Sequence, residues 1–490
     1  MRTFIITVII AVSACAGASA GTRNITLHEA IAIARTNSVD AAVALDELKS
    51  AYWEYRAFRA GLLPEVGFEA VLPGYFKQYN AYQRDDGSFT FVRSNYMQLT
   101  GALSVSQSIW PTGGTLSLTT SLDFLRQLDG NTGSRFMTVP VALTLNQPVF
   151  GVNTVKWNRR IEPVRYREAA ARFMTATENV SMIAISNYFD LLMARENVNV
   201  ARQNLINAEK LHDVAVVKRR MGQISENDLL QLELNKLNAR STLTDAESQM
   251  KSSMFRLRSF LDIEDDVELE PEVPERVSHV EIHYDDALGR AIDNNAFTHN
   301  QRRRQLEADY EVAKAKGDMR RIDLYASIGY TGADGSIGNA YRRMNDNQVV
   351  QVGVKIPILD WGRRRGRVKV AQSNRQVVES RLRQEAMEFK QDMFILVERF
   401  NNQQEQVEIA AMADTIAQKR YRTNVETFMI GKISTLDLND SQVRKDEQRR
   451  DYVNELYLYW YYYYQIRGLT LWDYARGCGI EADIDAVVKR

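Results

Sequence analysis

The sequence repeats itself at a distance of 209 residues, and this repeat constrains the fold more than any other feature. Residues 222–234 read Gly-Gln-Ile-Ser-Glu-Asn-Asp-Leu-Leu-Gln-Leu-Glu-Leu, and residues 431–438 read Gly-Lys-Ile-Ser-Thr-Leu-Asp-Leu. The same spacing relates Pro148 to Pro357. About seventy residues before each glycine are therefore duplicated without net insertion, which predicts an internal two-fold repeat built on long helices.

The duplicated stretches are long enough for exceptional helices. Pro148 and Gly222 are 74 residues apart, which corresponds to about 110 Å of continuous helix. The stretches 26–61 and 222–262 are shorter and together match that length, so we expect one long helix paired with two stacked ones in each half. Residues repeat every seven positions in two rows, which predicts a coiled-coil seam, although an ordinary bundle face would look much the same. The first row is Ala184, Leu191, Val198, Leu205 and His212, and the second is Ala194, Ala201, Ala208 and Ala215.

Between the first helical stretch and Pro148, apolar residues occur at every second position instead of at helical spacing. Four alternating segments in the first half and two in the second lie near residues 66–76, 96–110, 115–126, 136–147, 322–330 and 350–356. This spacing predicts strands. Segments of about ten alternating residues joined by polar loops are typical of an outer-membrane barrel, but a soluble sandwich alternates too.

The first residues have the order of a secretory signal peptide. Met1-Arg2 precede the apolar stretch 4–12, and Ala18-Ser19-Ala20 form an A-x-A cleavage site, so we expect residues 1–20 to be removed. A second interpretation is a lipoprotein-type site at which Cys15 becomes lipidated. No later segment approaches the ~20 apolar residues of a spanning helix, so a membrane crossing would have to use β-structure.

Charge, cysteine and histidine content exclude several classes of site. The chain has 62 basic and 62 acidic residues, so no basic excess favours nucleic acid as a partner. After signal-peptide cleavage only Cys478 remains, which excludes an intramolecular disulfide. The five histidines show no metal-ligand spacing, and no phosphate-binding glycine loop or nucleophile motif occurs. We therefore expect no enzymatic activity, no cofactor and no metal.

Two copies of strand, proline, long helix, Gly-x-x-Ser-x-x-Asp-Leu and returning helix resemble the TolC-type outer-membrane efflux family over essentially the whole mature chain. The resemblance implies a mainly α protein with membrane β-structure, in which a homotrimer shares an α-barrel of long coiled-coil helices and a β-barrel. It implies an outer-membrane location that extends into the periplasm. The implied function is a passive exit duct of a tripartite efflux or type I secretion system, whose partners are a periplasmic adaptor protein, an inner-membrane transporter and outer-membrane lipid.

The number of strands departs from the family's pattern. The archetype contributes two strands per half, whereas the first half here offers about four. The additional hairpin would either enlarge the barrel or lie at its rim or in the channel mouth. Closure by other copies is expected in each case, because open strand edges are costly in lipid.

A secreted or surface-anchored coiled-coil interaction protein without a pore is the alternative to a duct. The alternating segments discriminate between the two, because a duct needs one lipid-facing side on each strand whereas a coiled-coil rod needs no strands at all.

The repeat also predicts the order of the domains. We expect the signal peptide to be followed by a first repeat, an acidic linker, a second repeat and a C-terminal tail, at residues 21–262, 263–282, 283–470 and 471–490. Ala30 matches Ala287 and Asn37 matches Asn294 at a distance of 257, which places the extra residues in the first half. The acidic segment 264–275 is expected to be a solvated connector.

Gly222 and Gly431 lie where a long helix is expected to end and an antiparallel one to begin. Glycine suits a left-handed helix end, and the pairs Ser225/Asp228 and Ser434/Asp437 suit capping boxes of the returning helices. The resemblance adds a functional interpretation, in which these turns form the periplasmic tip where the adaptor docks. Ile224 and Ile433 would then offer apolar contacts beside the caps.

Asp437 and Asp440 match the position and spacing of the paired aspartates that line the family's narrow periplasmic entrance. Around a three-fold axis they would form rings of negative charge, a device for cation selectivity and gating. In the plain alternative Asp437 only caps its helix and Asp440 only faces solvent. The tyrosine and arginine that close the archetype's entrance are replaced here by Phe428 and Ile433, so a closed state must be held differently.

Two clusters invite a membrane-interface interpretation. The aromatic run 457–464 lies only about 50 Å beyond the second tip turn, so packing inside the helical region is favoured over a lipid girdle. Arg363, Arg364, Arg365 and Arg367 directly follow a strand and are better placed to meet phospholipid head groups. A solvated helix start is the ordinary alternative.

Overall fold

A computed structural model of the chain describes residues 22–129, 133–264, 267–275, 280–353, 360–430, 432–480 and 482–488. The expected signal peptide with Cys15, and also Gly431, lie outside the described residues. Contacts divide the chain into two compact units. Unit 1 combines the residues up to Leu48 with 170–295 and 388–490, and unit 2 combines 49–169 with 296–387, so each unit draws on both halves of the repeat.

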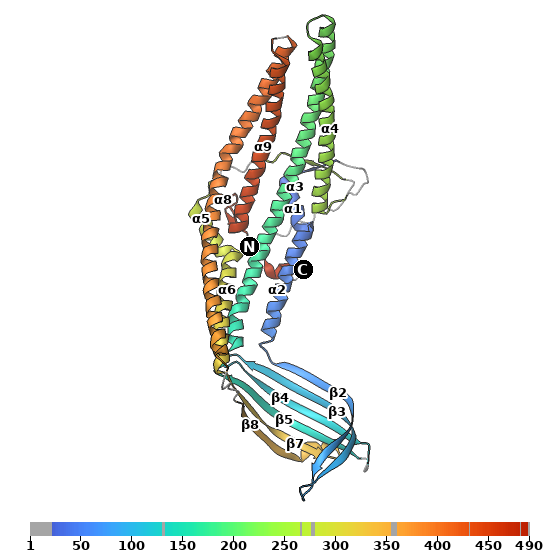
Figure 1. Cartoon of the computed structure of the whole chain (residues 1–490), viewed down its shortest axis with the longest axis vertical. Helices are drawn as coiled ribbons and strands as arrows, with labels where there is room; N and C mark the ends of the chain where they lie inside the picture. The colour runs from blue at the N-terminus through green and yellow to red at the C-terminus, as the bar shows by residue number, and fades with distance from the viewer. Residues whose placement is uncertain are drawn as a thin grey trace, which may run out of the picture. The chain divides into compact units, whose positions relative to one another are not determined.

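The 209-residue repeat is confirmed by the helices (Figure 1). Helices α3 (Thr154–Arg220) and α8 (Arg363–Met429) have 67 residues each, and they begin and end 209 residues apart. The returning helices α4 (Glu226–Leu261) and α9 (Thr435–Thr470) have 36 residues each and keep the same distance. The duplication therefore preserves helix length to the residue.

The expected single helix over 26–61 is wrong in one respect, because it breaks at Ser38 into α1 (Leu27–Asn37) and α2 (Val39–Ala60). Ser38 is extended, is buried, and accepts a hydrogen bond from the Ala41 N–H at 3.2 Å, so it caps α2. The second half has the same break at Asn295, between α5 (Tyr284–Asn294) and α6 (Ala296–Arg320). The first helices of the two halves begin 257 residues apart, as expected.

Unit 1 is helical and has one main core. The core lies between α1, α3, α4, α5, α8 and α9, and its largest fully buried side chains include Trp460, Tyr188, Tyr459 and Phe400. The predicted seam is largely confirmed, since Ala184, Leu191 and Val198 are buried, although Leu205 and His212 are only half-buried.

The acidic segment between the halves is not simply a solvated connector, and that prediction is wrong for its middle. Residues Glu268–Pro271 form strand β6, which pairs in parallel with β1 (Thr22–Ile25). Leu269 is buried in the core between its acidic neighbours. The Tyr188 hydroxyl bonds to the carbonyl oxygens of Ile25 (3.0 Å) and Glu272 (2.6 Å), so the segment is fastened to α3.

The C-terminal segment also folds back on unit 1. Strands β9 (Trp472–Asp473) and β10 (Cys478–Gly479) form a small antiparallel pair, and a short helix, α10 (Ile484–Val488), follows. Asp473 is buried and accepts a hydrogen bond from the Tyr463 hydroxyl at 2.7 Å. The tail thus contributes to the core.

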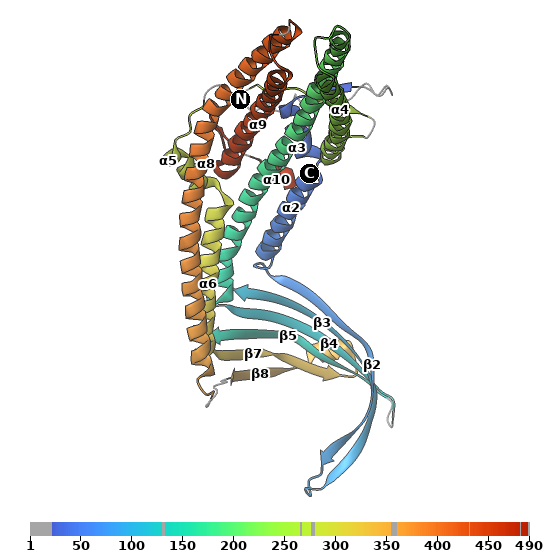
Figure 2. The ribbon, with the colours of Figure 1, turned by 45° about the horizontal axis from the view of Figure 1, so that its top comes forward.

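Unit 2 contains a six-stranded antiparallel sheet in the order β2-β3-β4-β5-β7-β8 (Figure 2). Four strands come from the first half and two from the second, which confirms the extra hairpin; they are β2 (Glu65–Gln83), β3 (Phe89–Ile109), β4 (Gly114–Gln127), β5 (Ser134–Val149), β7 (Ile322–Asp334) and β8 (Met344–Gly353). A short helix, α7 (Ile337–Arg342), joins β7 to β8. The sheet therefore has two edge strands, β2 and β8.

The β2–β3 hairpin is longer than the rest of the sheet. Strand β3 pairs with β2 from Phe89 to Ser106 but with β4 only from Tyr96 onward. Residues 77–83 and 89–95 therefore pair only with each other, and the distal part of the hairpin extends past β4 (Figure 2). A bulge between Val71 and Gly74 interrupts the register a few residues before the distal part begins.

Candidate functional site

The six-stranded sheet has one apolar and one polar face, and the strand register makes this explicit. Val105 lies opposite Leu118, Leu118 opposite Leu143, and Leu143 opposite Ile328, so one row across four strands is entirely apolar. The next row is entirely hydroxylic and consists of Ser106, Ser117, Thr144 and Ser327. Because side chains alternate along a strand, these two rows lie on opposite faces.

The apolar face is exposed, whereas the polar face makes its own hydrogen bonds. Leu118 is 44% and Ile328 55% exposed, and among the described strands no second sheet covers them, as a soluble sandwich would require. On the other face the hydroxyls of Ser106 and Ser117 lie 3.1 Å apart, and the Gln98 side-chain amide donates to Asp123 at 3.2 Å. One face suits lipid and the other suits water.

Both tip turns have the predicted capping boxes. Gly222 has φ +73°, which a glycine adopts without strain. The Ser225 hydroxyl accepts from the Asp228 N–H at 3.1 Å while the Asp228 carboxylate accepts from the Ser225 N–H, and Ser434 with Asp437 repeats this arrangement. Hydrogen bonds from the serines lower the pKa of both aspartates.

The two predicted docking isoleucines are partly used by the protein itself. Ile224 and Ile433 are half-buried and pack on a small core that includes Leu211, Leu232 and Leu438. The most exposed apolar side chains near the tips are others, namely Met221, Leu230, Met429, Ile430 and Leu436. Sequence reasoning missed these five, although their position beside the two turns was a usable signal.

Asp437 and Asp440 have different surroundings. Asp437 is engaged in its cap, whereas the Asp440 carboxylate contacts the Arg420 guanidinium at 3.0 Å and lies 3.9 Å from Arg444. Asp440 therefore does not simply face solvent. Arg420 lies on α8, and no local signal could have identified it, because the antiparallel α8–α9 pairing brings it to Asp440.

The aromatic run on α9 packs inside unit 1, as predicted. Tyr459, Trp460, Tyr463 and Tyr464 are all buried in the main core. The Trp460 ring meets His28 edge-on, with ring centroids 5.5 Å apart. These aromatic residues stabilise the helical unit and are not a lipid girdle.

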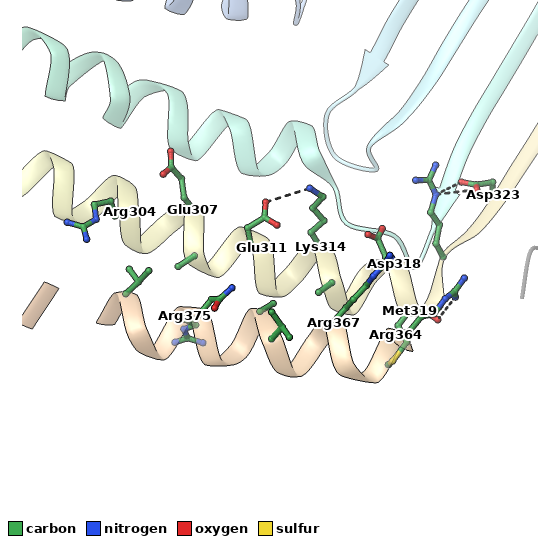
Figure 3. Close-up of a pocket in the computed structure, with 17 residues that line it drawn as sticks. Arg304, Glu307, Glu311, Lys314, Asp318, Met319, Asp323, Arg364, Arg367 and Arg375 are labelled. Atoms are coloured by element: carbon green, nitrogen blue, oxygen red, sulfur yellow. Dashed lines mark hydrogen bonds and ion pairs between the residues drawn. The ribbon is translucent and has the colours of Figure 1, made fainter. Parts of the chain in front are cut away.

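Two of the four arginines at the start of α8 border a groove of about 900 Å³ within unit 2 (Figure 3). The groove lies between the end of α6 and the start of α8 and includes Arg364 and Arg367. Arg364 donates to the Met319 carbonyl oxygen at 3.3 Å, while Asp360 accepts the N–H groups of Gly362 and Arg364 and so caps the helix. These backbone hydrogen bonds lower the Asp360 pKa.

The described part of the chain has neither a metal-binding cluster nor a membrane-spanning helix. It contains no group of three or more His, Cys, Asp or Glu residues placed to hold a metal ion. Within the same residues, no helix has both the length and the apolar character needed to cross a bilayer.

A family model for outer membrane efflux proteins matches residues 30–261 and 292–460, which is most of the chain and includes both repeats. The chain belongs to this family. Its members are transport proteins rather than enzymes, and the expected fold and outer-membrane channel function are confirmed at the level of the family. The tip turns and the paired aspartates lie within the matched range.

Solved structures of outer-membrane channels share the fold of this efflux-family chain at low sequence identity. The CmeC outer membrane channel of Campylobacter jejuni is 14% identical with a TM-score of 0.67, and the match covers 94% of this chain and 88% of CmeC. The outer membrane protein VceC of Vibrio cholerae is 15% identical with a TM-score of 0.63, and the match covers 93% of this chain and 97% of VceC. The MtrE outer membrane channel of Neisseria gonorrhoeae, in its open state, is 13% identical with a TM-score of 0.57, and the match covers 94% of this chain and 90% of MtrE. No protein of curated function matches the sequence.

Proposed function

We propose that three copies of this efflux-family chain form a passive exit duct, with the apolar face of the sheet in the outer membrane and the hydroxyl face lining the lumen. The observation that carries this proposal is the alternation of complete apolar and hydroxyl rows across the sheet of unit 2. A sheet of this kind needs lipid on one side and water on the other. A coiled-coil interaction protein without a pore would need neither.

The edges of the sheet support assembly from several copies. Six antiparallel strands leave β2 and β8 running in opposite directions, so β8 of one copy and β2 of the next would pair in the antiparallel sense. Pairing satisfies backbone groups that would otherwise be unbonded in lipid, and a head-to-tail ring repeats the same contact until it closes. The number three is taken from the family resemblance.

The tips support docking of a periplasmic adaptor protein that connects the duct to an inner-membrane transporter. Each tip presents a rigid capped turn beside exposed apolar side chains such as Met221 and Leu436. Asp437 and Asp440 would line the entrance, and Arg420 would limit the charge that Asp440 contributes. The duct performs no chemistry in this proposal, and the energy for transport comes from the transporter.

Single-channel recording in planar bilayers tests this function. We expect the purified protein to insert and to produce discrete conductance steps. A folded, heat-resistant trimer that enters the bilayer and never conducts would contradict the proposal.

A matched pair of variants tests which face meets lipid. Leu118→Arg places a charge in the apolar row and should oppose insertion by about 2–4 kcal/mol, whereas Ser117→Arg on the other face should insert and change the conductance. Equal insertion of both variants, measured by membrane fractionation, would contradict the assigned orientation.

A further inference from the structure

The helix ends that adjoin the sheet in unit 2 carry a large excess of positive charge. The segments 56–64, 154–161, 314–323 and 360–369 contain fourteen arginines and lysines and three aspartates. Thirteen of the fourteen are exposed, and Arg364 is half-buried. These segments lie before β2 and β7 or after β5 and β8, so all four are at the same end of the strands, where the sheet meets the helices of unit 2 (Figure 2). We call these fourteen residues the basic collar.

Within the part of the chain that the structure describes, most charges of the collar have no ionic partner. Among the described residues, only Arg321 and Lys314 have a carboxylate within ion-pair distance, Asp323 at 2.8 Å and Glu311 at 3.6 Å. The first turn of α8 contains arginine and no acidic residue. A positive charge there opposes the helix dipole, so the stability of α8 does not explain it. The collar therefore presents cationic groups that can meet an anion from outside the chain.

Exposed aromatic side chains lie at the same end of the strands. Trp110 follows β3, Phe150 follows β5 and Trp361 precedes α8, and they are 53%, 70% and 89% exposed. The Arg159 guanidinium stacks over Trp110 at 4.3 Å from the ring centroid. Tryptophan beside arginine is typical of the level where a bilayer's apolar core meets its head groups.

The groove of Figure 3 offers a place for a head group within the collar. Arg364 and Arg367 line it from α8, and Lys314 lines it from α6, with its ammonium turned toward Glu311 (Figure 3). The groove also has four carboxylates, of which three have cationic partners: Glu311 pairs with Lys314, Asp323 pairs with Arg321 at 2.8 Å, and Glu307 lies 3.0 Å from Arg165, while Asp318 is the fourth. Among the described residues, Arg364 and Arg367 have no carboxylate within ion-pair distance, so these two guanidinium groups suit a phosphate.

We propose that the basic collar binds the phosphate groups of anionic phospholipids in the leaflet that meets the helix side of the sheet. This rests on the proposed function, because it requires the sheet to lie in a bilayer. Anionic lipid is favoured over zwitterionic lipid because basic residues attract a negative surface, and each arginine or lysine near it adds to the attraction.

Native mass spectrometry of the full-length assembly tests the proposal. The protein is incubated with equal amounts of phosphatidylglycerol and phosphatidylcholine of the same acyl chains, and bound lipid is counted. We expect phosphatidylglycerol to exceed phosphatidylcholine by about fivefold or more at low salt, and the excess to shrink at about 0.5 M NaCl because exposed charges are then screened.

Two triple variants of α8 separate the collar from charge in general. Arg363→Gln/Arg365→Gln/Arg367→Gln should lose most of the preference, whereas Arg381→Gln/Arg383→Gln/Lys390→Gln removes three exposed charges elsewhere on the helix and should keep it. Equal binding of the two lipids by the unmodified protein, or equal loss in both variants, would overturn the proposal. Stronger competition by lipid A than by phosphatidylglycerol would overturn the assignment to phospholipid.

Conductance of the same preparations distinguishes the two proposals. An assembly that conducts but shows no preference for phosphatidylglycerol contradicts the lipid site alone. An assembly that neither inserts nor conducts contradicts the proposed duct.

Discussion

At the scale of single residues, the contact between Arg420 and Asp440 determines how much charge the second tip exposes. The two groups lie 3.0 Å apart, and both are about half exposed. If Asp440 lines the entrance, Asp440→Asn should lower the permeability ratio of cations to anions by about two- to threefold, because it removes a ring of charge. Arg420→Ala should raise the ratio. Reversal potentials in a KCl gradient measure both effects.

Arg422 provides the control for this prediction, because it is an exposed arginine two residues further along the same helix. Arg422→Ala should leave the permeability ratio near that of the unmodified protein. Equal shifts in Arg420→Ala and Arg422→Ala would show that the contact with Asp440 does not matter.

A second residue-scale feature is the buried carboxylate of Glu178, which contacts Arg35 at 2.7 Å and Arg467 at 3.3 Å. Burial raises its pKa above the ordinary 4.5, and the two arginines offset this only in part. Glu178→Ala should lower the free energy of unfolding by about 3–5 kcal/mol, because it strands two positive charges in the core. Glu178→Gln should be milder, because it keeps hydrogen-bonding atoms and carries no charge.

The raised pKa of Glu178 also predicts a pH dependence. The folded state holds this proton more tightly than the unfolded state, so this group's contribution to stability falls as the pH rises from about 4.5 through the folded pKa. The melting temperature of Glu178→Gln relative to the unmodified protein should therefore increase over that range. Glu405→Gln, at an exposed position on α8, is the control and should show no such trend.

At the scale of elements, the β2–β3 hairpin consists of two parts with different roles. Its distal residues pair with each other, and their contacts beyond the hairpin include the ion pair of Arg93 with Asp129 at 2.6 Å and the hydrogen bond that the Asn95 carbonyl oxygen accepts from the Leu128 N–H at 2.8 Å. Replacing residues 78–94 by an Asn-Gly turn should therefore preserve the trimer and its conductance. Heat-resistant trimer on a gel and single-channel recording measure the outcome.

The β4–β5 hairpin is the matched control, because both of its strands have partners on each side. Its shortening by deletion of residues 116–145 should abolish assembly, since β3 and β7 would then lose most of their strand partners. If the β2–β3 replacement abolished assembly as completely, the distal hairpin would have to be part of the subunit interface.

At the scale of the whole molecule, the two edge strands predict how copies meet. With Cys478 replaced by serine, cysteine pairs that combine Val66, Phe68 or Ala70 with Met344 or Asp346 should yield disulfide-linked multimers. These positions lie on the same face of the sheet and on its two edges, so pairing of β8 with the next β2 brings some of them together. Non-reducing electrophoresis measures the product.

Leu118→Cys on the inner strand β4 is the control partner for Met344→Cys and should give no cross-link. Cross-linking of β4 to β8, without any from β2, would place the extra hairpin outside the closed sheet. Cross-linking from β2 would mean that every copy contributes six strands, and the barrel diameter would grow accordingly.

Particular elements show where sequence reasoning succeeded. The 209-residue distance predicted α3 and α8 as equals, and the Ser225/Asp228 and Ser434/Asp437 pairs predicted their capping boxes. Sequence reasoning was less successful at Ser38, where a helix break appears, and in the acidic segment, where strand β6 appears. Both exceptions depend on partners elsewhere in unit 1, which local composition does not reveal.

The sequence was sufficient for the duplication, the helix lengths, the caps and the alternation of the strands. Helix period, capping and strand period depend on residues only a few places apart, so they can be read along the chain. The tertiary structure alone decided that β2 and β8 are the edges, that Arg420 meets Asp440, and that four distant basic segments form one collar. These depend on contacts between residues tens to hundreds of places apart, which are settled by packing and strand pairing.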